Sequence, residues 1–198
     1  EAFDEWIIPK SGVKYGYGRF FDEWSERDLV GMIHRDRNHP CVILWSIGNE
    51  IKEQAAPQGG AMASRLADIC HREDPTRPVS SGVNKMGQAT ANGFVKALDV
   101  LGMNYFTGEY VNQRGKLLVA AETSSALSTR GQYGLELKPD GKVAINTRAN
   151  NQCVSYDLDH PGWGCTAEAS LLAVGSAPWI AGEFVWTGFD YIGEPTPY

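Results

Sequence analysis

The chain has 198 residues, of which 24 are acidic and 18 are basic, so its formal net charge is −6. Hydrophobic residues make up 42% of the chain, enough for a sizeable core, which excludes disordered, collagen-like and disulfide-dense classes. The acidic balance argues against a nucleic-acid partner, because binding phosphates requires a concentrated basic face. No stretch approaches the ~18 uninterrupted apolar residues that span a membrane, so we expect no membrane partner either.

Helices and strands alternate along the first two thirds of the chain. Residues 1–24 are typical of an aromatic, glycine-rich loop. Ser25 is a suitable helix N-cap, and Asp28 three residues later completes a loose capping box, which predicts a helix over 26–37. The next predicted elements are a buried strand over 41–47, a helix over 59–72, a strand over 78–81, a weak helix over 90–97, and strands over 99–105 and 116–121.

The last third begins with a long polar stretch. Residues 123–165 are rich in Gly, Asn and Asp and have no predicted helix or strand. Thr166 then predicts the cap of a helix that runs to residue 175, and residues 179–186 form the last predicted strand. Strands that alternate with helices predict an α/β fold with a parallel sheet and right-handed crossovers. No sequence repeat and no domain boundary interrupts the pattern.

Polar side chains follow two of the buried strands. Asn49 and Glu50 come after the strand over 41–47, and Glu122 follows the strand over 116–121. Each acid could simply begin a helix, where the dipole favours a negative charge. However, ligands of parallel α/β folds lie at the carboxyl ends of the strands, so both carboxylates would reach the same rim. Paired carboxylates divide acid and nucleophile roles, as cleavage of a glycosidic bond requires.

Three aromatic residues are candidates for substrate binding at the same level. Tyr105 and Trp186 close two predicted strands, and Trp6 lies in the first loop. Flat aromatic faces suit the apolar faces of sugar rings, and a tyrosine hydroxyl can hydrogen-bond a nearby carboxylate. Core packing is the commoner fate of a tryptophan, so both interpretations stay open for each residue.

The segment Arg35–Glu50 resembles the acid/base signature of glycoside hydrolase family 2, which includes β-galactosidases, β-glucuronidases and β-mannosidases. Residues 1–6, 121–123 and 184–195 are similar to the third, seventh and eighth barrel strands of that family. The resemblance implies a partial (β/α)8 TIM barrel, from roughly the end of strand 3 through strand 8. A whole barrel needs about 250 residues, so we expect residues 1–198 to be a single fragment of a TIM-barrel catalytic domain.

The resemblance also implies roles for individual residues. Glu50 would be the general acid/base and Glu122 the nucleophile of a retaining mechanism, for which carboxyl groups about 5–5.5 Å apart are expected. Asn49 would hydrogen-bond the 2-hydroxyl of the sugar. Tyr105 would hydrogen-bond Glu122, and Trp186 would be part of the sugar-binding floor.

The resemblance implies the activity of a retaining exo-β-glycosidase, and among these enzymes it favours a β-galactosidase. The Asn-X-Lys element with which β-glucuronidases bind a carboxylate is not evident after Glu122, and the ending Tyr191–Pro195 favours galactose. We expect no cofactor: Glu5 could match a Mg²⁺ ligand of some family members, but Ile7 stands where the histidine ligand would be.

Two alternative functions stay open. The first is a β-glucuronidase or another glycosidase of family 2, and the second is a non-catalytic carbohydrate-binding module. Family analogy suggests a periplasmic or extracellular location and allows a homo-oligomer of the full-length protein.

Overall fold

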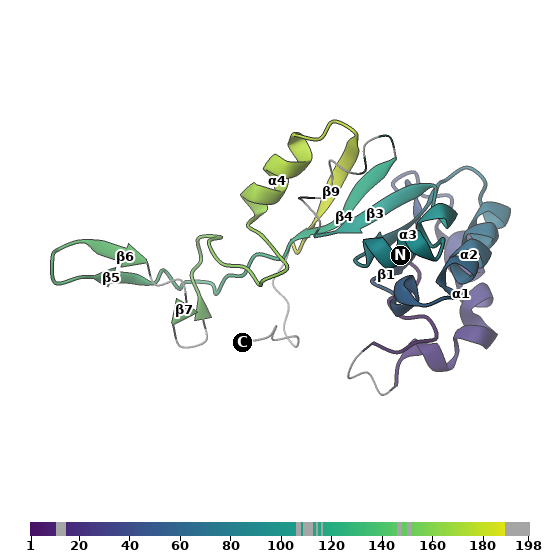
Figure 1. Cartoon of the computed structure of the whole chain (residues 1–198), viewed down its shortest axis with the longest axis horizontal. Coiled ribbons are helices and arrows are strands. Elements are labelled where there is room, and N and C mark those ends of the chain that lie inside the picture. The colour runs from purple at the N-terminus through teal and green to yellow at the C-terminus, as the bar shows by residue number, and fades with distance from the viewer. Residues whose placement is uncertain are drawn as a thin grey trace.

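The computed structural model describes residues 1–10, 15–105, 108, 113, 115, 117–145, 148–149 and 152–188. Its centre is a five-stranded sheet with the strand order β1-β2-β3-β4-β9, in which every pairing is parallel (Figure 1). The carboxyl ends of the strands therefore share one rim. The strands are β1 (Trp45–Asn49), β2 (Val79–Val83), β3 (Val100–Asn104), β4 (Leu118–Ser124) and β9 (Ile180–Trp186).

Helices connect β1 to β2, β2 to β3, and β4 to β9, as parallel connections require. α2 packs against β1 and β2, α1 packs against α2, and α4 packs against β4 and β9 (Figure 1). None of the helices in the described ranges is long and apolar enough to cross a membrane. The α-helices are α1 (Phe21–Asp36), α2 (Gly59–Glu73), α3 (Met86–Ala91) and α4 (Ala167–Gly175), and the short 3-10 helices are η1 (Tyr17–Arg19), η2 (Lys52–Ala55) and η3 (Val95–Ala97).

The N-terminal segment extends this sheet beyond β1. The amide of Ala2 donates to the carbonyl oxygen of Ser46 at 2.8 Å, and the amide of Asn49 donates to the carbonyl oxygen of Phe3 at 3.0 Å. Residues 2–3 therefore run alongside β1, as expected for the end of the strand that precedes it in a barrel. The element order and this pairing agree with an arc from the end of strand 3 through strand 8.

Trp6 belongs to the core rather than to the rim. Its side chain is completely buried, and its indole nitrogen donates to the carbonyl oxygen of Ile47 at 3.0 Å. The ring packs against Phe21 and stacks on Phe94, with centroid distances of 5.8 and 5.5 Å. The prediction that Trp6 binds sugar is therefore wrong, because a buried tryptophan whose N–H is already bonded has no face to offer a ligand.

Three predicted boundaries differ from the structure. α1 begins at Phe21, and Ser25 lies within it, buried, where it accepts a hydrogen bond from Arg65 Nη2 at 2.9 Å. β1 begins only at Trp45, and in the segment before it the carbonyl oxygens of His39 and Val42 accept hydrogen bonds from Arg77. The predicted helix over 90–97 is two elements, α3 and η3, separated at Gly93, whose φ is +86°.

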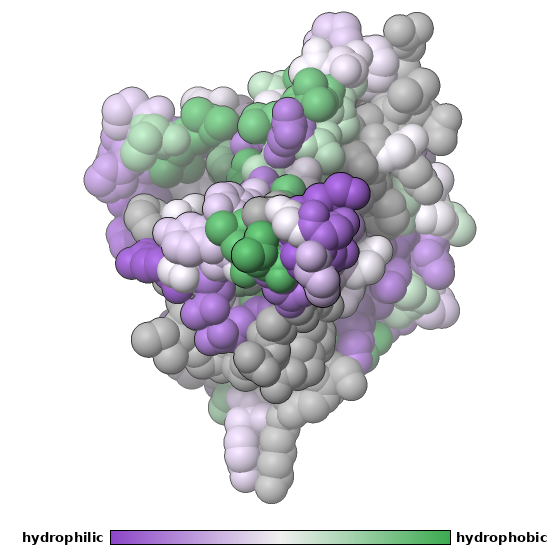
Figure 2. Space-filling view, turned by 90° about the vertical axis from the view of Figure 1, so that its left-hand side faces the viewer, coloured by the Kyte–Doolittle hydropathy of each residue, from purple (hydrophilic) through white to green (hydrophobic). Residues whose placement is uncertain are grey.

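The long polar stretch has secondary structure that the sequence did not predict. It contains two small antiparallel hairpins that extend away from the sheet (Figure 1). Figure 2 views the molecule from the side of these hairpins, where hydrophilic and hydrophobic residues are interspersed on the surface. Strands of two or three residues are too short to produce a periodic signal. After this stretch the predicted cap is confirmed: Thr166 Oγ1 accepts from the amide of Ala169 at 3.3 Å. The hairpin strands are β5 (Leu135–Leu137), β6 (Val143–Ile145), β7 (Arg148–Ala149) and β8 (Gln152–Cys153).

Candidate active site

Four of the predicted site residues meet at the carboxyl rim of the sheet. Asn49 ends β1 and Glu50 follows it, Tyr105 follows β3, and Glu122 lies in the last half of β4. The register places Asn104, the last residue of β3, opposite Glu122. Neighbouring parallel strands that end together bring these side chains to one place.

The side-chain amide of Asn104 contacts both carboxylates and so limits the distance between them. Asn104 Nδ2 lies 3.0 Å from Glu50 Oε1 and 3.5 Å from Glu122 Oε2. The distance between Glu50 Oε1 and Glu122 Oε2 can therefore not exceed the sum of these two distances, about 6.5 Å. Both carboxylates therefore lie within contact distance of the same amide nitrogen.

Glu122 is surrounded by hydrogen-bond donors. The hydroxyl of Tyr105 donates to Glu122 Oε1, and Asn49 Nδ2 donates to Glu122 Oε2 at 3.3 Å. The backbone is fixed as well, since the amide of Tyr105 donates to the carbonyl oxygen of Glu122 at 2.8 Å. Burial, together with the hydrogen bond to Glu122, raises the pKa of Tyr105, so its hydroxyl keeps its proton and remains a donor.

The pKa of Glu122 is raised above its usual value. Burial is the largest cause, and the nearby charge of Glu50 acts in the same direction. The hydrogen bonds from Tyr105 and Asn49, with the positive charge of Lys10, oppose this rise. Tyr105 and Asn49 therefore help Glu122 to ionise in a place where burial disfavours the charge.

Backbone conformation at the rim is constrained by neighbouring groups. Glu50 and Tyr105 have φ angles of 51° and 60°, in the left-handed region that costs non-glycine residues free energy. The amide of Glu50 donates to the carbonyl oxygen of Gly82 at 2.9 Å, which holds this conformation. A Cβ at Gly82 would lie 2.2 Å from Asn49 Oδ1, so a side chain there would displace that amide.

Trp186 lies on a cavity of about 560 Å³ whose lining includes Asn49 and Glu122. It is the last residue of β9 and is paired in register with Ser124, just beyond Glu122 on β4. Its side chain is 42% exposed, so the ring has a face available to a ligand. The structure thus brings Trp186 to the same hollow as the carboxylate of Glu122.

Asn104 is the site residue that the sequence interpretation missed. It is completely buried, and its Nδ2 contacts Asn49 Oδ1 at 2.8 Å besides the two carboxylates. The signal was present, because a polar side chain ends an apolar strand directly before Tyr105. The same reasoning that singled out Asn49 would have found it.

Glu5 and Ile7 do not fit the metal site of some family members. Both carboxylate oxygens of Glu5 accept backbone amides, from Gly18 at 2.9 Å and from Lys10 at 3.0 Å. Ile7 has no ligating atom in its side chain. Across the described ranges, no three His, Cys, Asp or Glu side chains are grouped so that they could hold a metal ion.

Comparisons with known proteins match this chain to one family. Residues 22–128 match the family model "Glycosyl hydrolases family 2, TIM barrel domain". The chain is 37% identical to beta-galactosidase BoGH2A of Bacteroides ovatus, over 100% of this chain and 28% of that protein. A family 2 crystal structure from Bacteroides cellulosilyticus has a TM-score of 0.69 at 31% identity, over 96% of this chain and 20% of that one.

A more distant structure has the same fold. The beta-glucuronidase of Bacteroides uniformis superposes with a TM-score of 0.63 at 21% identity, over 93% of this chain and 23% of that one. The chain therefore spans less than a third of the length of each of these three relatives. The predicted fold class is confirmed: the sheet is an arc of a TIM barrel.

Proposed function

Because the chain belongs to glycosyl hydrolase family 2, we propose that it carries the two catalytic carboxylates of a retaining exo-β-glycosidase that hydrolyses terminal β-galactosides. The contact of Asn104 with both Glu50 and Glu122 is the observation that carries this proposal. It limits the separation of the two oxygens to about 6.5 Å. Retaining glycosidases have carboxyl groups about 5–5.5 Å apart, whereas inverting enzymes need about 6.5–9.5 Å to admit a water molecule.

In the first step, Glu122 attacks the anomeric carbon while Glu50 gives its proton to the glycosidic oxygen. The bond between the anomeric carbon and that oxygen breaks, and the leaving group departs as an alcohol. Tyr105 and Asn49 hold the attacking carboxylate in place through their hydrogen bonds. In the second step, Glu50 takes a proton from water, the water oxygen attacks the anomeric carbon, and Glu122 leaves as a carboxylate.

Galactose is the proposed sugar, because the relative that is 37% identical across the whole chain is named a beta-galactosidase. In this proposal Asn49 hydrogen-bonds the 2-hydroxyl and the ring of Trp186 forms part of the floor beneath the sugar. Both side chains line the cavity that also reaches Glu122. The ending Tyr191–Pro195, which favoured galactose in the sequence, lies outside the described residues.

The sugar preference is tested with the full-length protein on nitrophenyl β-galactoside, β-glucuronide and β-mannoside. We expect the highest kcat/KM on the galactoside, and the first product observed by NMR should keep the β configuration. A preference for the glucuronide would contradict the galactosidase assignment. Binding of all three sugars without turnover would instead favour a carbohydrate-binding module.

The pH dependence tests the contact between Tyr105 and Glu122. Tyr105→Phe removes a hydrogen bond that lowers the pKa of Glu122, so this pKa should rise further above its usual value. The reaction needs ionised Glu122, and kcat/KM falls as the pH drops through that pKa. The acidic limb of the kcat/KM profile should therefore move to higher pH.

The matched control is Tyr133→Phe, because Tyr133 is exposed in the polar stretch, away from the rim. This variant should keep the wild-type profile. An acidic limb that stays in place in Tyr105→Phe would contradict the role of this hydroxyl.

A further inference from the structure

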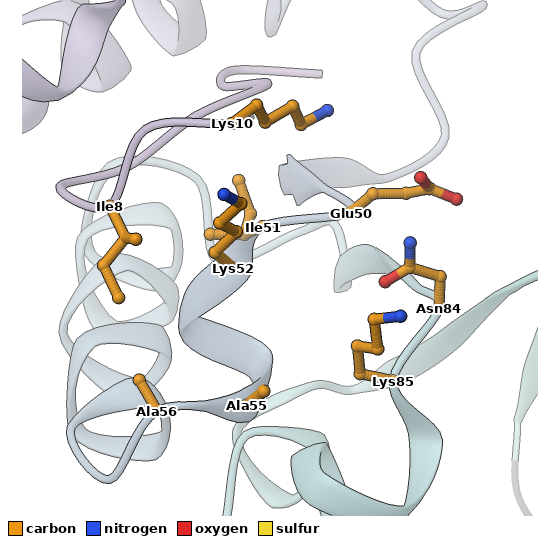
Figure 3. A pocket seen from close by; sticks show the side chains of 9 residues that line it. All are labelled: Ile8, Lys10, Glu50, Ile51, Lys52, Ala55, Ala56, Asn84 and Lys85. Atoms are coloured by element: carbon orange, nitrogen blue, oxygen red, sulfur yellow. The ribbon is translucent and has the colours of Figure 1, made fainter. Parts of the chain in front are cut away.

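A second cavity, of about 600 Å³, opens beside Glu50. Glu50 lines this cavity and Glu122 does not, whereas Asn49 and Glu122 line the first cavity. Asn49 and Glu50, which are adjacent in the chain, therefore line two different hollows. Figure 3 shows the second cavity with Glu50 at its edge; its other lining residues are Ile8, Lys10, Ile51, Lys52, Ala55, Ala56, Asn84 and Lys85.

Three lysines from three different segments surround this cavity (Figure 3). Lys10 comes from the N-terminal loop and is paired with exposed Asp4 at 2.7 Å. Lys52 belongs to η2, and Lys85 precedes α3. Neither Lys52 nor Lys85 has an ion-pair partner within the part of the chain that the structure describes. The cavity thus combines apolar walls with two lysines that have no ion-pair partner among the described residues.

A buried glutamine fixes the backbone that carries these lysines. Gln54 is completely buried, and its Oε1 accepts the amides of Asn84 at 3.0 Å and Lys85 at 3.1 Å. Its Nε2 donates to the carbonyl oxygen of Gly82 at 2.9 Å, the same oxygen that accepts the amide of Glu50. The segments that bear Lys52 and Lys85 are therefore tied to each other and to the strand end that positions Glu50.

We propose that this second cavity is the subsite for the leaving group, and that Lys52 and Lys85 select leaving groups that carry a negative charge. The inference rests on the proposed function, since an acid that protonates the glycosidic oxygen lies on the leaving-group side of the sugar. The chemical class is a carboxylate on an apolar body, because Ile8, Ile51 and the two alanines supply apolar walls. Such a leaving group is either an aromatic acid or a uronic acid residue.

The test compares matched leaving groups on the full-length protein at low ionic strength. The pairs are 4-carboxyphenyl and 4-carbamoylphenyl β-galactoside for an aromatic acid, and galactose β-linked to glucuronate or to glucose for a uronic acid. Lys52 and Lys85 are both exposed, and two exposed charge pairs predict a kcat/KM ratio of acid to neutral substrate on the order of 5–10 in at least one pair of substrates. This ratio should decrease with added salt. The pair with the higher ratio identifies the source of the charge.

The double variant Lys52→Gln/Lys85→Gln should reduce this ratio to near one, whereas Lys52→Arg/Lys85→Arg should keep most of it. Lys96→Gln is the control, because Lys96 lies on η3 outside this cavity. A wild-type ratio near one in both pairs, or a ratio that survives the double Gln substitution, would overturn the inference alone. Absence of turnover on every substrate would overturn the proposed function and this inference with it.

Discussion

Replacing Glu122 with glutamine lowers kcat on nitrophenyl β-galactoside by about 10⁴-fold or more, because the amide cannot form the covalent bond to the anomeric carbon. The substitution keeps the shape of the side chain, so the change reports on chemistry rather than on packing. The measurement is steady-state kinetics of the full-length protein. Glu168→Gln is the matched control, since Glu168 is exposed in the first turn of α4, and it should retain wild-type kcat.

Glu122→Gly gives a second test of the same role. The truncation leaves a space beside Tyr105 into which azide can enter and attack the anomeric carbon from the face that the carboxylate occupied. An activated substrate such as dinitrophenyl β-galactoside should then yield the α-glycosyl azide. Substantial activity in Glu122→Gln, or a glycine variant that azide does not rescue, would contradict the nucleophile assignment.

Replacing Glu50 with alanine lowers kcat/KM by a factor that depends on the leaving group of the substrate. A general acid/base contributes about 10²–10⁴-fold, so a substrate with a poor leaving group should lose that much in kcat/KM. Dinitrophenolate departs without protonation, so the kcat/KM of its galactoside should fall far less. The measurement is a comparison of methylumbelliferyl, nitrophenyl and dinitrophenyl galactosides in wild type and variant.

Azide again distinguishes the two carboxylates. In Glu50→Ala it replaces the activated water in the second step and should yield the β-glycosyl azide, the opposite anomer to that from Glu122→Gly. Glu53→Ala is unsuitable as a control, because the buried Glu53 carboxylate accepts the amide of Ile8. Exposed Glu26→Ala serves instead. An equal loss on all three leaving groups would contradict the acid/base role of Glu50.

The sequence predicted the parts of the site that depend on where strands end. Asn49, Glu50 and Glu122 follow apolar strands, and parallel pairing alone brings such residues to one rim. The contact of Tyr105 with Glu122 was implied by the family resemblance, and the place of Tyr105 directly after the neighbouring strand agrees with it. These predictions needed the element order but no detail of side-chain packing.

Other features depend on tertiary contacts that no local pattern contains. Trp6 could have faced a sugar or the core, and only the positions of Phe21 and Phe94 decide that it is buried. The sugar-facing role predicted for it was therefore wrong. Ser25 is a residue type that often caps helices, but here the helix starts earlier, at Phe21. The hydroxyl of Ser25 instead accepts a hydrogen bond from Arg65, which lies 40 residues away in the chain.

For Asn104, the sequence could predict the position of the residue but not its contacts. Its position at the end of β3 was visible in the sequence, but its contact with both carboxylates follows from the register between β3 and β4. The need for glycine at position 82 could not be predicted from the sequence either. A Cβ there would contact the side chains of Asn49 and Asn104, which come from the two strands on either side of β2. Register and close approach are set by the assembled sheet.

The central claim is that Glu122 forms a covalent bond to the sugar. Incubating the full-length protein with dinitrophenyl 2-deoxy-2-fluoro-β-galactoside should accumulate the glycosyl-enzyme, because fluorine at carbon 2 slows hydrolysis of the intermediate. Peptide mass spectrometry should then find one fluorogalactosyl group on the peptide that contains Glu122, and fragmentation should place it on that residue. A label on any other residue, or turnover of the reagent without any label, would contradict the claim.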